Sequence, residues 1–166
     1  RDGIIAASIY VSSRINQFPR TAKEIATIFH LDNTSATRGC KNAVSIINDI
    51  EHMLSSEQKT NLFNTTPSSF IDRYCSRLNI NQELTKLCKF IAMQIQRNNY
   101  IPENTPHSIA AGIVYFVSQI CMLNISKHDV HNISEISEVT INKCNKKLEQ
   151  LRDKLVPRAI INKYCQ

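Results

Sequence analysis

Residues 105–146 read TPHSIAAGIVYFVSQICMLNISKHDVHNISEISEVTINKCNK. Thr105 followed by Pro106 is typical of a helix start, because a proline at the first helical position lacks only an N–H that would have no partner there. Ser126 and Asp129 have the spacing of a capping box, in which hydroxyl and carboxylate each accept a backbone N–H. The apolar residues recur at helical spacing. We therefore predict three consecutive helices, over 105–123, 126–134 and 138–154.

The same pattern occurs a second time earlier in the chain. Shifting the sequence by 105 positions without gaps aligns residues 4–41 with residues 109–146, beginning with Ile4 on Ile109. Besides the identical residues, the capping residues and the apolar positions of the two segments also align. We therefore interpret the pattern as an internal duplication. The identical pairs are Ile4 and Ile109, Ala6 and Ala111, Tyr10 and Tyr115, Ser13 and Ser118, Ile15 and Ile120, Ile28 and Ile133, and Lys41 and Lys146.

The rest of the chain also favours helices. Only three glycines occur in 166 residues and few stretches alternate as strands do, so the expected fold class is all-α. Further helices are predicted over 2–16, 21–30, 34–53, 67–78 and 82–98. The last two precede the second copy and have no counterpart before the first, which we expect to be truncated at its N-terminus. The expected order is an incomplete first repeat (1–54), a polar linker (55–66), a second repeat (67–156) and a basic tail (157–166).

The basic charge is concentrated at the C-terminal end. The whole chain has 20 Lys and Arg against 14 Asp and Glu, a net charge of +6. Residues 139–166 hold seven basic and two acidic side chains and so supply +5 of that charge. Such a local excess is typical of a surface that binds a polyanion, with a solvated charged face as the alternative interpretation.

Composition also disfavours several classes of protein. No run of about 18 apolar residues occurs, which excludes a membrane span. The six cysteines form no C-x-x-C pair and are expected to be reduced core residues. His128 and His131 have no cysteine nearby to complete a zinc site, so no metal is expected. No nucleophile or acid–base pair has a recognisable spacing, so an enzyme is not expected.

Each repeat contains a short capped helix, a tight polar turn and a second helix, which is the spacing of a helix-turn-helix. In such a unit the second helix can enter the major groove of DNA with its N-terminal residues at base edges, while the N-terminus of the first helix approaches a phosphate. In the second repeat the candidate DNA-binding residues are Ser126, Lys127, Val139, Thr140, Asn142, Lys143 and Lys146.

Four motifs then occur in the order found in a known family. PRTAKEI (19–25) resembles the P-R-T-x-K-E-I turn and helix of the cyclin-like repeats in transcription initiation factor IIB. FIDRYCSRL (70–78) resembles the F-I-x-R-F-C-S-x-L opening of that family's second repeat. PHSIAAGIVY (106–115) is similar to its S-P-x-S-I-A-A-A-A-I-Y helix, and EVTI (138–141) to the start of its recognition helix. The resemblance covers nearly the whole chain.

The resemblance implies two cyclin-like repeats that bind the TATA-binding protein on promoter double-stranded DNA and bridge it to RNA polymerase. It implies a zinc ribbon only in an N-terminal part outside this sequence, so no cofactor is expected here. The implied location is the nucleus, or a cytoplasmic viral factory for a viral protein. Two alternatives stay open: a factor of the RNA polymerase III branch, and a cyclin-type regulatory subunit of a kinase.

The resemblance also implies roles for individual residues. Asn142 stands where the family usually has a base-reading arginine, so the preference for guanine at that position is open, and an asparagine could pair with adenine instead. Arg38 and Lys41 match basic positions of the first repeat. Weaker DNA binding is expected from that repeat, because lysines common in the family are replaced by Asn33, Thr34 and Ser45. The expected phosphate contacts are Arg38, Lys143, Lys146 and Lys147.

Overall fold

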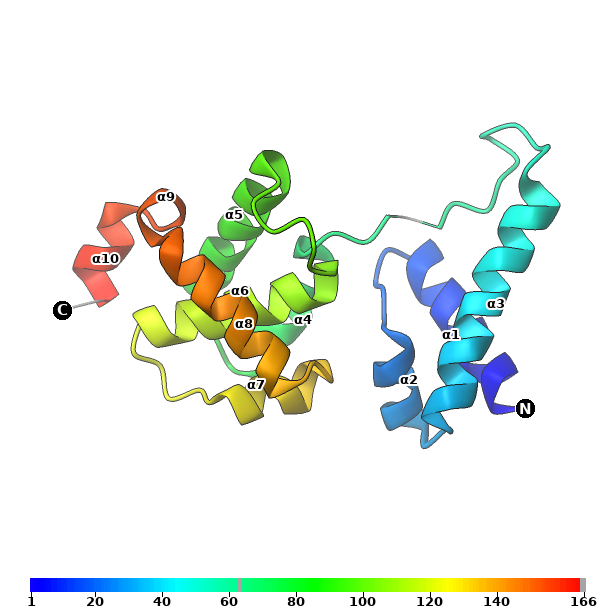
Figure 1. Cartoon of the computed structure of the whole chain (residues 1–166), viewed down its shortest axis with the longest axis horizontal. Coiled ribbons are helices and arrows are strands. Elements are labelled where there is room, and N and C mark those ends of the chain that lie inside the picture. Colours follow the sequence, from blue (N-terminus) through cyan, green and yellow to red (C-terminus); the bar gives the residue numbers. More distant parts are fainter. Residues whose placement is uncertain (63, 165–166) are drawn as a thin grey trace. The chain divides into compact units, whose positions relative to one another are not determined.

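A computed structural model describes residues 1–62 and 64–164 of the chain. In these residues the chain forms ten helices and no strand (Figure 1). The predicted all-α fold class is therefore confirmed. The chain divides into two compact units, Arg1–Thr65 and Thr66–Gln166, which we call unit 1 and unit 2 and describe separately.

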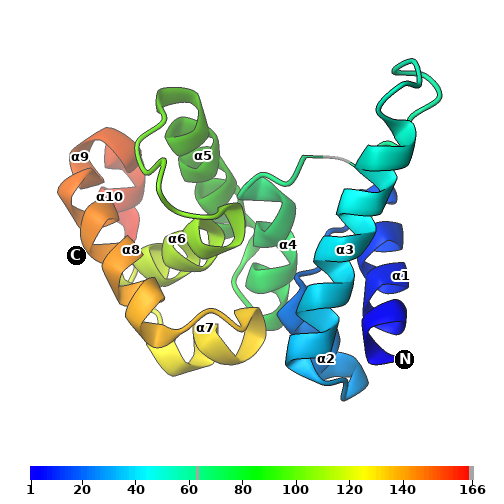
Figure 2. The same ribbon diagram turned by 45° about the vertical axis from the view of Figure 1, so that its right-hand side comes forward.

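Unit 1 consists of three helices, α1 (Asp2–Ile15), α2 (Ala22–Phe29) and α3 (Asn33–Glu51). Helices α1 and α3 lie side by side (Figure 2), and α2 contacts both. The crossing of α1 and α3 is close, because a Cβ added at Gly39 would lie 2.6 Å from the Cα of Gly3. The buried core of this unit is small and comprises Ala6, Ile25, Ala26, Ala36 and Cys40.

Unit 2 is built around one central helix, α6, which packs against four others. Ten of the fifteen residues of α6 are buried, so it forms the middle of the larger core. Its crossing with α8 is close as well, since a Cβ added at Gly112 would lie 2.6 Å from the Cβ of Cys144. The helices are α4 (Ser68–Arg77), α5 (Gln82–Asn98), α6 (Pro106–Ile120), α7 (Lys127–Ser134), α8 (Glu138–Gln150), α9 (Arg152–Leu155) and α10 (Arg158–Tyr164).

The internal duplication is visible in the backbone. Helices α1, α2 and α3 correspond to α6, α7 and α8, and unusual backbone angles recur at equivalent places. Two residues after the first helix of each set, φ is positive at Gln17 (64°) and Met122 (51°). Directly after the second helix it is positive again, at His30 (51°) and Glu135 (58°). Such angles are uncommon outside glycine, so their recurrence at the predicted shift supports a common origin of the two sets.

The two sets of helices differ in whether further helices pack on the first helix of the set. In unit 2, α4 and α5 pack on α6, and Ile109 is only 7 % exposed. The described residues of unit 1 include no counterpart of these two helices, and the equivalent Ile4 is 74 % exposed. Ile4 on α1 is therefore open where the equivalent Ile109 is covered, and the incomplete first repeat stays a prediction.

The C-terminal end differs from the predicted helices. A helix was expected over 138–154, but α8 ends at Gln150 and a separate turn, α9, follows it. Residues 157–166 were expected as a basic tail, and they include the short helix α10. The five described cysteines are buried and form no disulfide, as expected, and Cys165 lies outside the described residues. Those five are Cys40, Cys75, Cys88, Cys121 and Cys144.

Candidate nucleic-acid interface

Helix α7, the first helix of the unit 2 helix-turn-helix, is fixed by the predicted capping box. Ser126 Oγ accepts from the Asp129 N–H at 3.1 Å, and Asp129 Oδ2 accepts from the Ser126 N–H at 2.8 Å. The Ser126 N–H and hydroxyl both donate to Asp129 Oδ2, and these two hydrogen bonds hold the pKa of the Asp129 carboxyl below its ordinary value. The Ser126 hydroxyl is engaged in the cap, and the neighbouring Lys127 is half-buried.

The turn between α7 and α8 is held on its inner side. His131 Nδ1 lies 2.8 Å from the Ile136 carbonyl oxygen, so this ring stabilises the turn. Val130 and Ile133 on α7 are buried, and so is Ile141 on α8. Because buried apolar contacts fix the angle between the two helices, the outer face of α8 has a defined geometry.

Four of the predicted residues lie together on that outer face. Val139 and Lys146 lie about two turns apart on α8, and Asn142 and Lys143 lie between them, each three or four positions from both, so the four side chains share one side of the helix. Val139 is 64 % exposed, Lys143 and Lys146 are exposed, and Asn142 is half-buried. Within the described residues, no salt bridge joins either lysine to a carboxylate. We call these four residues the α8 face.

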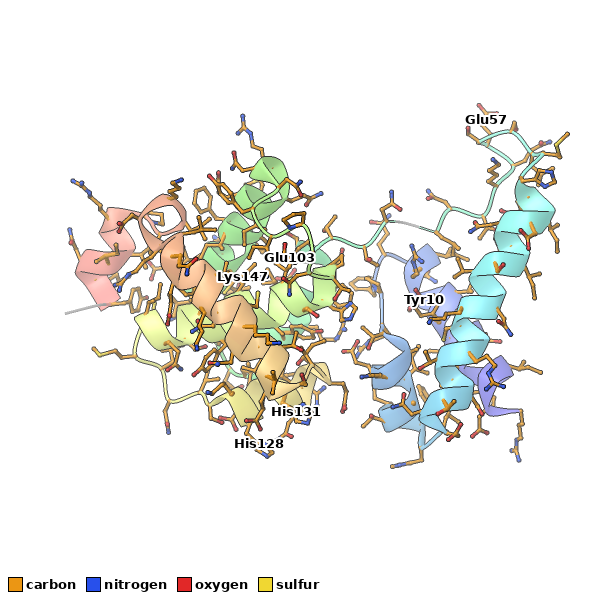
Figure 3. All side chains as sticks on the ribbon, viewed as in Figure 1. Tyr10, Glu57, Glu103, His128, His131 and Lys147 are labelled. Carbon is orange, nitrogen blue, oxygen red and sulfur yellow. The ribbon has the colours of Figure 1, made fainter. Side chains whose placement is uncertain are left out.

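Two other predicted residues on α8 have partners inside unit 2. Thr140 Oγ1 lies 2.8 Å from Ser137 Oγ at the N-cap of the helix, so the hydroxyl is engaged there. Lys147 Nζ forms an ion pair with Glu103 in the loop before α6 and also lies 3.2 Å from Asn104 Oδ1 (Figure 3). The lysine holds the pKa of the Glu103 carboxyl below its ordinary value. A phosphate contact by Lys147 would have to replace this ion pair.

Further basic residues of the C-terminal segment also have internal partners. Lys163 Nζ donates to Glu83 Oε2 at 2.7 Å, and Tyr164 donates to the same oxygen at 2.5 Å. Lys154 Nζ lies 6.0 Å from the centre of the Tyr100 ring. Of the seven basic residues in 139–166, Lys147, Lys154 and Lys163 thus make contacts within unit 2, and Lys143 and Lys146 belong to the α8 face.

The two N-termini of the unit 2 helix-turn-helix are joined by a pair that the sequence analysis did not identify. His128 Nδ1 on α7 lies 3.2 Å from Glu138 Oε1 at the start of α8. Figure 3 places His128 and His131 on α7, and their rings lie 6.2 Å apart. Both histidines thus have structural roles. No cluster of metal-ligating side chains occurs in residues 1–62 and 64–164, and no helix in that part is long and apolar enough to cross a bilayer.

In unit 1, Arg38 and Lys41 lie together beside a hollow of about 420 Å³. A third basic residue, Lys23 at the start of α2, lines the same hollow and was missed in the sequence. Lys23 is far from the other two along the chain, so no local spacing in the sequence groups the three basic residues. The remaining lining residues are Asn33, Thr34 and Thr37.

The fold and these surfaces define an all-α protein made of two related helical units, each with a helix-turn-helix. Comparison with known protein families identifies the family to which the chain belongs. Residues 60–151 match the transcription factor TFIIB repeat, and the chain belongs to this family. The resemblance seen in the sequence is confirmed, and so is the expectation that the chain is not an enzyme, because the members of this family are transcription factors.

Individual relatives agree with the family. The chain is 34 % identical over 156 residues to a transcription initiation factor IIB-like protein of Acanthamoeba polyphaga mimivirus, covering 94 % of this chain and 33 % of that protein. It is 28 % identical over 164 residues to transcription initiation factor IIB of Encephalitozoon cuniculi, covering 98 % and 48 %. For the Dictyostelium discoideum factor the identity is 26 % over 156 residues, covering 94 % and 45 %. The chain thus spans one third to one half of the length of these relatives.

Proposed function

We propose that the chain is the core of a general transcription initiation factor, which binds promoter DNA together with the TATA-binding protein and bridges both to RNA polymerase. Family membership and relatives named as initiation factors support this function over a kinase regulatory subunit. The observation that carries the proposal is the α8 face, with two unpaired cations, one amide and one exposed apolar side chain on a rigid helix.

Each side chain of the α8 face suits one part of a DNA duplex. Lys143 and Lys146 can neutralise backbone phosphates. Asn142 can form two hydrogen bonds with an adenine edge, and Val139 can contact a thymine methyl group in the major groove. The α8 face therefore supplies both charge and base contacts, in the positions that a recognition helix uses.

The lysines and the other two side chains of the α8 face have different effects on DNA binding. Phosphate contacts strengthen binding to any sequence, whereas the contacts of Asn142 and Val139 distinguish sequences.

We infer that the factor acts where its DNA is transcribed. This is the nucleus or, since one relative is viral, a viral compartment.

The test is the salt dependence of binding to a TATA-containing duplex that already holds the TATA-binding protein. Lys146→Glu is expected to weaken binding and to reduce the slope of log K against log salt by about 0.9, the value for one phosphate contact. Lys86→Glu is the matched control, because Lys86 is an exposed residue of α5 in the same unit. Equal effects of the two substitutions, or an unchanged slope for Lys146→Glu, would contradict the assignment of the α8 face.

A further inference from the structure

An acidic side chain, Glu138, stands beside the α8 face at the first position of α8. It precedes Val139 and lies four positions before Asn142, so it borders Asn142 on the surface of the helix. Its side chain is 48 % exposed. The N-cap of α8 is Ser137, whose hydroxyl oxygen accepts from the Thr140 N–H at 3.2 Å. The Glu138 carboxylate is therefore not needed to cap the helix, and it can be reached from outside.

One carboxylate oxygen of Glu138 is held by a residue of the neighbouring helix. His128 Nδ1 on α7 lies 3.2 Å from Glu138 Oε1. A carboxylate only accepts hydrogen bonds, so the Nδ1–H of His128 is the donor in this pair. Within residues 1–62 and 64–164, Oε2 of the same carboxylate has no hydrogen bond and no ion pair. Glu138 thus presents one free acceptor oxygen, while its other oxygen is anchored to α7.

The first position of such a helix does not itself require an acid. At the shift of 105 residues, Glu138 corresponds to Asn33 and His128 corresponds to Lys23. Asn33 is likewise the first residue of its helix, after the N-cap Asp32, and that helix forms with an amide at this position. The pair of His128 with Glu138 is therefore a feature of unit 2 and not of the duplicated backbone.

The four bases differ in what they offer to a carboxylate in the major groove. Guanine presents only acceptors there, adenine presents a donor next to an acceptor, and thymine presents an acceptor and a methyl group. Cytosine presents only the donor of its amino group. Because base acceptors and backbone phosphates both repel a carboxylate, the cytosine amino group is the part of a duplex that a free oxygen of Glu138 binds best.

We propose that Glu138 reads a cytosine in the major groove, with Oε2 accepting a hydrogen bond from the amino group of the base. His128 is the positioning residue that holds the carboxylate for this contact. The inference rests on the proposed function and deepens it, because it names a base that the helix-turn-helix of unit 2 distinguishes. Glu138 then adds a cytosine contact to the adenine and thymine contacts that Asn142 and Val139 can make.

The experiment selects duplexes from a pool in which a TATA element, holding the TATA-binding protein, is flanked by randomised base pairs. The full chain, Glu138→Gln and Glu149→Gln are compared by sequencing the duplexes that each one binds. Glu149 is the matched control, because it is an exposed glutamate at the other end of α8.

The parent chain is expected to favour cytosine at one flanking position by about fivefold, the lower end of what one base pair contributes. Glu138→Gln should favour adenine at that position, since an amide offers a donor and an acceptor to the adenine edge. Glu149→Gln should keep the parent's selection at every position.

The role of His128 is tested through its coupling to Glu138. His128→Ala should weaken the selection of cytosine at the same position and at no other. His128→Asn, whose amide nitrogen can take the place of Nδ1, should retain that selection. In the Glu138→Gln background, His128→Ala should have no further effect there. Thermal unfolding checks that the variants fold, and His128→Ala reaches the same base contact by a second route if Glu138→Gln does not fold.

The outcomes separate the two proposals. If the parent chain recovers no duplex from the pool, the proposed function fails. If the parent binds without favouring cytosine, or if Glu138→Gln keeps the cytosine, the proposed function stands and the base contact of Glu138 is refuted. If Glu138→Gln weakens binding to all flanking sequences equally, Glu138 is structural only and the contact is refuted as well. If His128→Ala leaves the selection unchanged, the positioning role of His128 is refuted.

Discussion

Replacing Gly112 by alanine tests the close crossing of α6 and α8. The added Cβ would lie 2.6 Å from the Cβ of Cys144, a separation that requires the helices or the side chain to move. Overpacking of this kind costs about 3 kcal/mol at its upper range. The better helix propensity of alanine offsets about 1 kcal/mol, so we expect a net loss of about 2 kcal/mol in the free energy of unfolding of unit 2.

The duplication provides a compensating change. The positions equivalent to Gly112 and Cys144 in unit 1 are Ala7 and Gly39, so at this pair of positions the glycine stands on the other helix. The double variant Gly112→Ala/Cys144→Gly places the unit 1 pair of residues at these two positions. It should be more stable than the sum of the two single variants predicts, with a coupling of about 1–3 kcal/mol.

Urea unfolding followed by circular dichroism measures these energies for the full chain. Cys144→Gly alone serves as the control, because it removes a buried side chain without adding a clash. Additive effects of the two substitutions, or a Gly112→Ala variant as stable as the parent, would contradict the conclusion that the close crossing of α6 and α8 leaves no room for a side chain at position 112.

Three further predictions concern the contacts around the interface. Glu103→Gln should release Lys147 for a phosphate and steepen the salt slope of DNA binding by up to about 0.9; an unchanged slope would show that Lys147 faces no phosphate. Asp129→Asn should destabilise the chain above about pH 5 but not below the lowered pKa of Asp129, because the stability from a carboxylate with a depressed pKa is lost as pH falls through that pKa. Urea unfolding of parent and variant at several pH values checks this. A difference in the free energy of unfolding that stays constant at all pH values would contradict it. Burial raises the pKa of the Cys144 thiol to about 11, so iodoacetamide at about pH 8 should modify it only after unfolding, as followed by mass spectrometry; rapid reaction in the native state would place that thiol at the surface.

The features predicted correctly from the sequence are the local ones. A capping box needs only residues three positions apart, and both predicted boxes, Thr21 with Glu24 and Ser126 with Asp129, are present. The duplication was equally accessible, because an ungapped shift preserves every spacing. Helix starts and the all-α class follow from such short-range patterns.

The features that were missed depend on residues far apart in the chain. Lys147 meets Glu103, 44 positions away, so a lysine that looked free in the sequence has a partner in the fold. Helix α10 is short, with residues that meet Glu83 on α5, and its periodicity is too brief to detect. Lys23 could be grouped with Arg38 only once the packing of α2 on α3 was known.

The most direct test of the central claim is a mobility-shift measurement on a TATA-containing duplex, with and without the TATA-binding protein. The account predicts a slower complex that forms only when both proteins are present, and that is lost when Lys143 and Lys146 are both changed to glutamate. A complex that forms equally well without the TATA-binding protein, or that survives both substitutions, would contradict it.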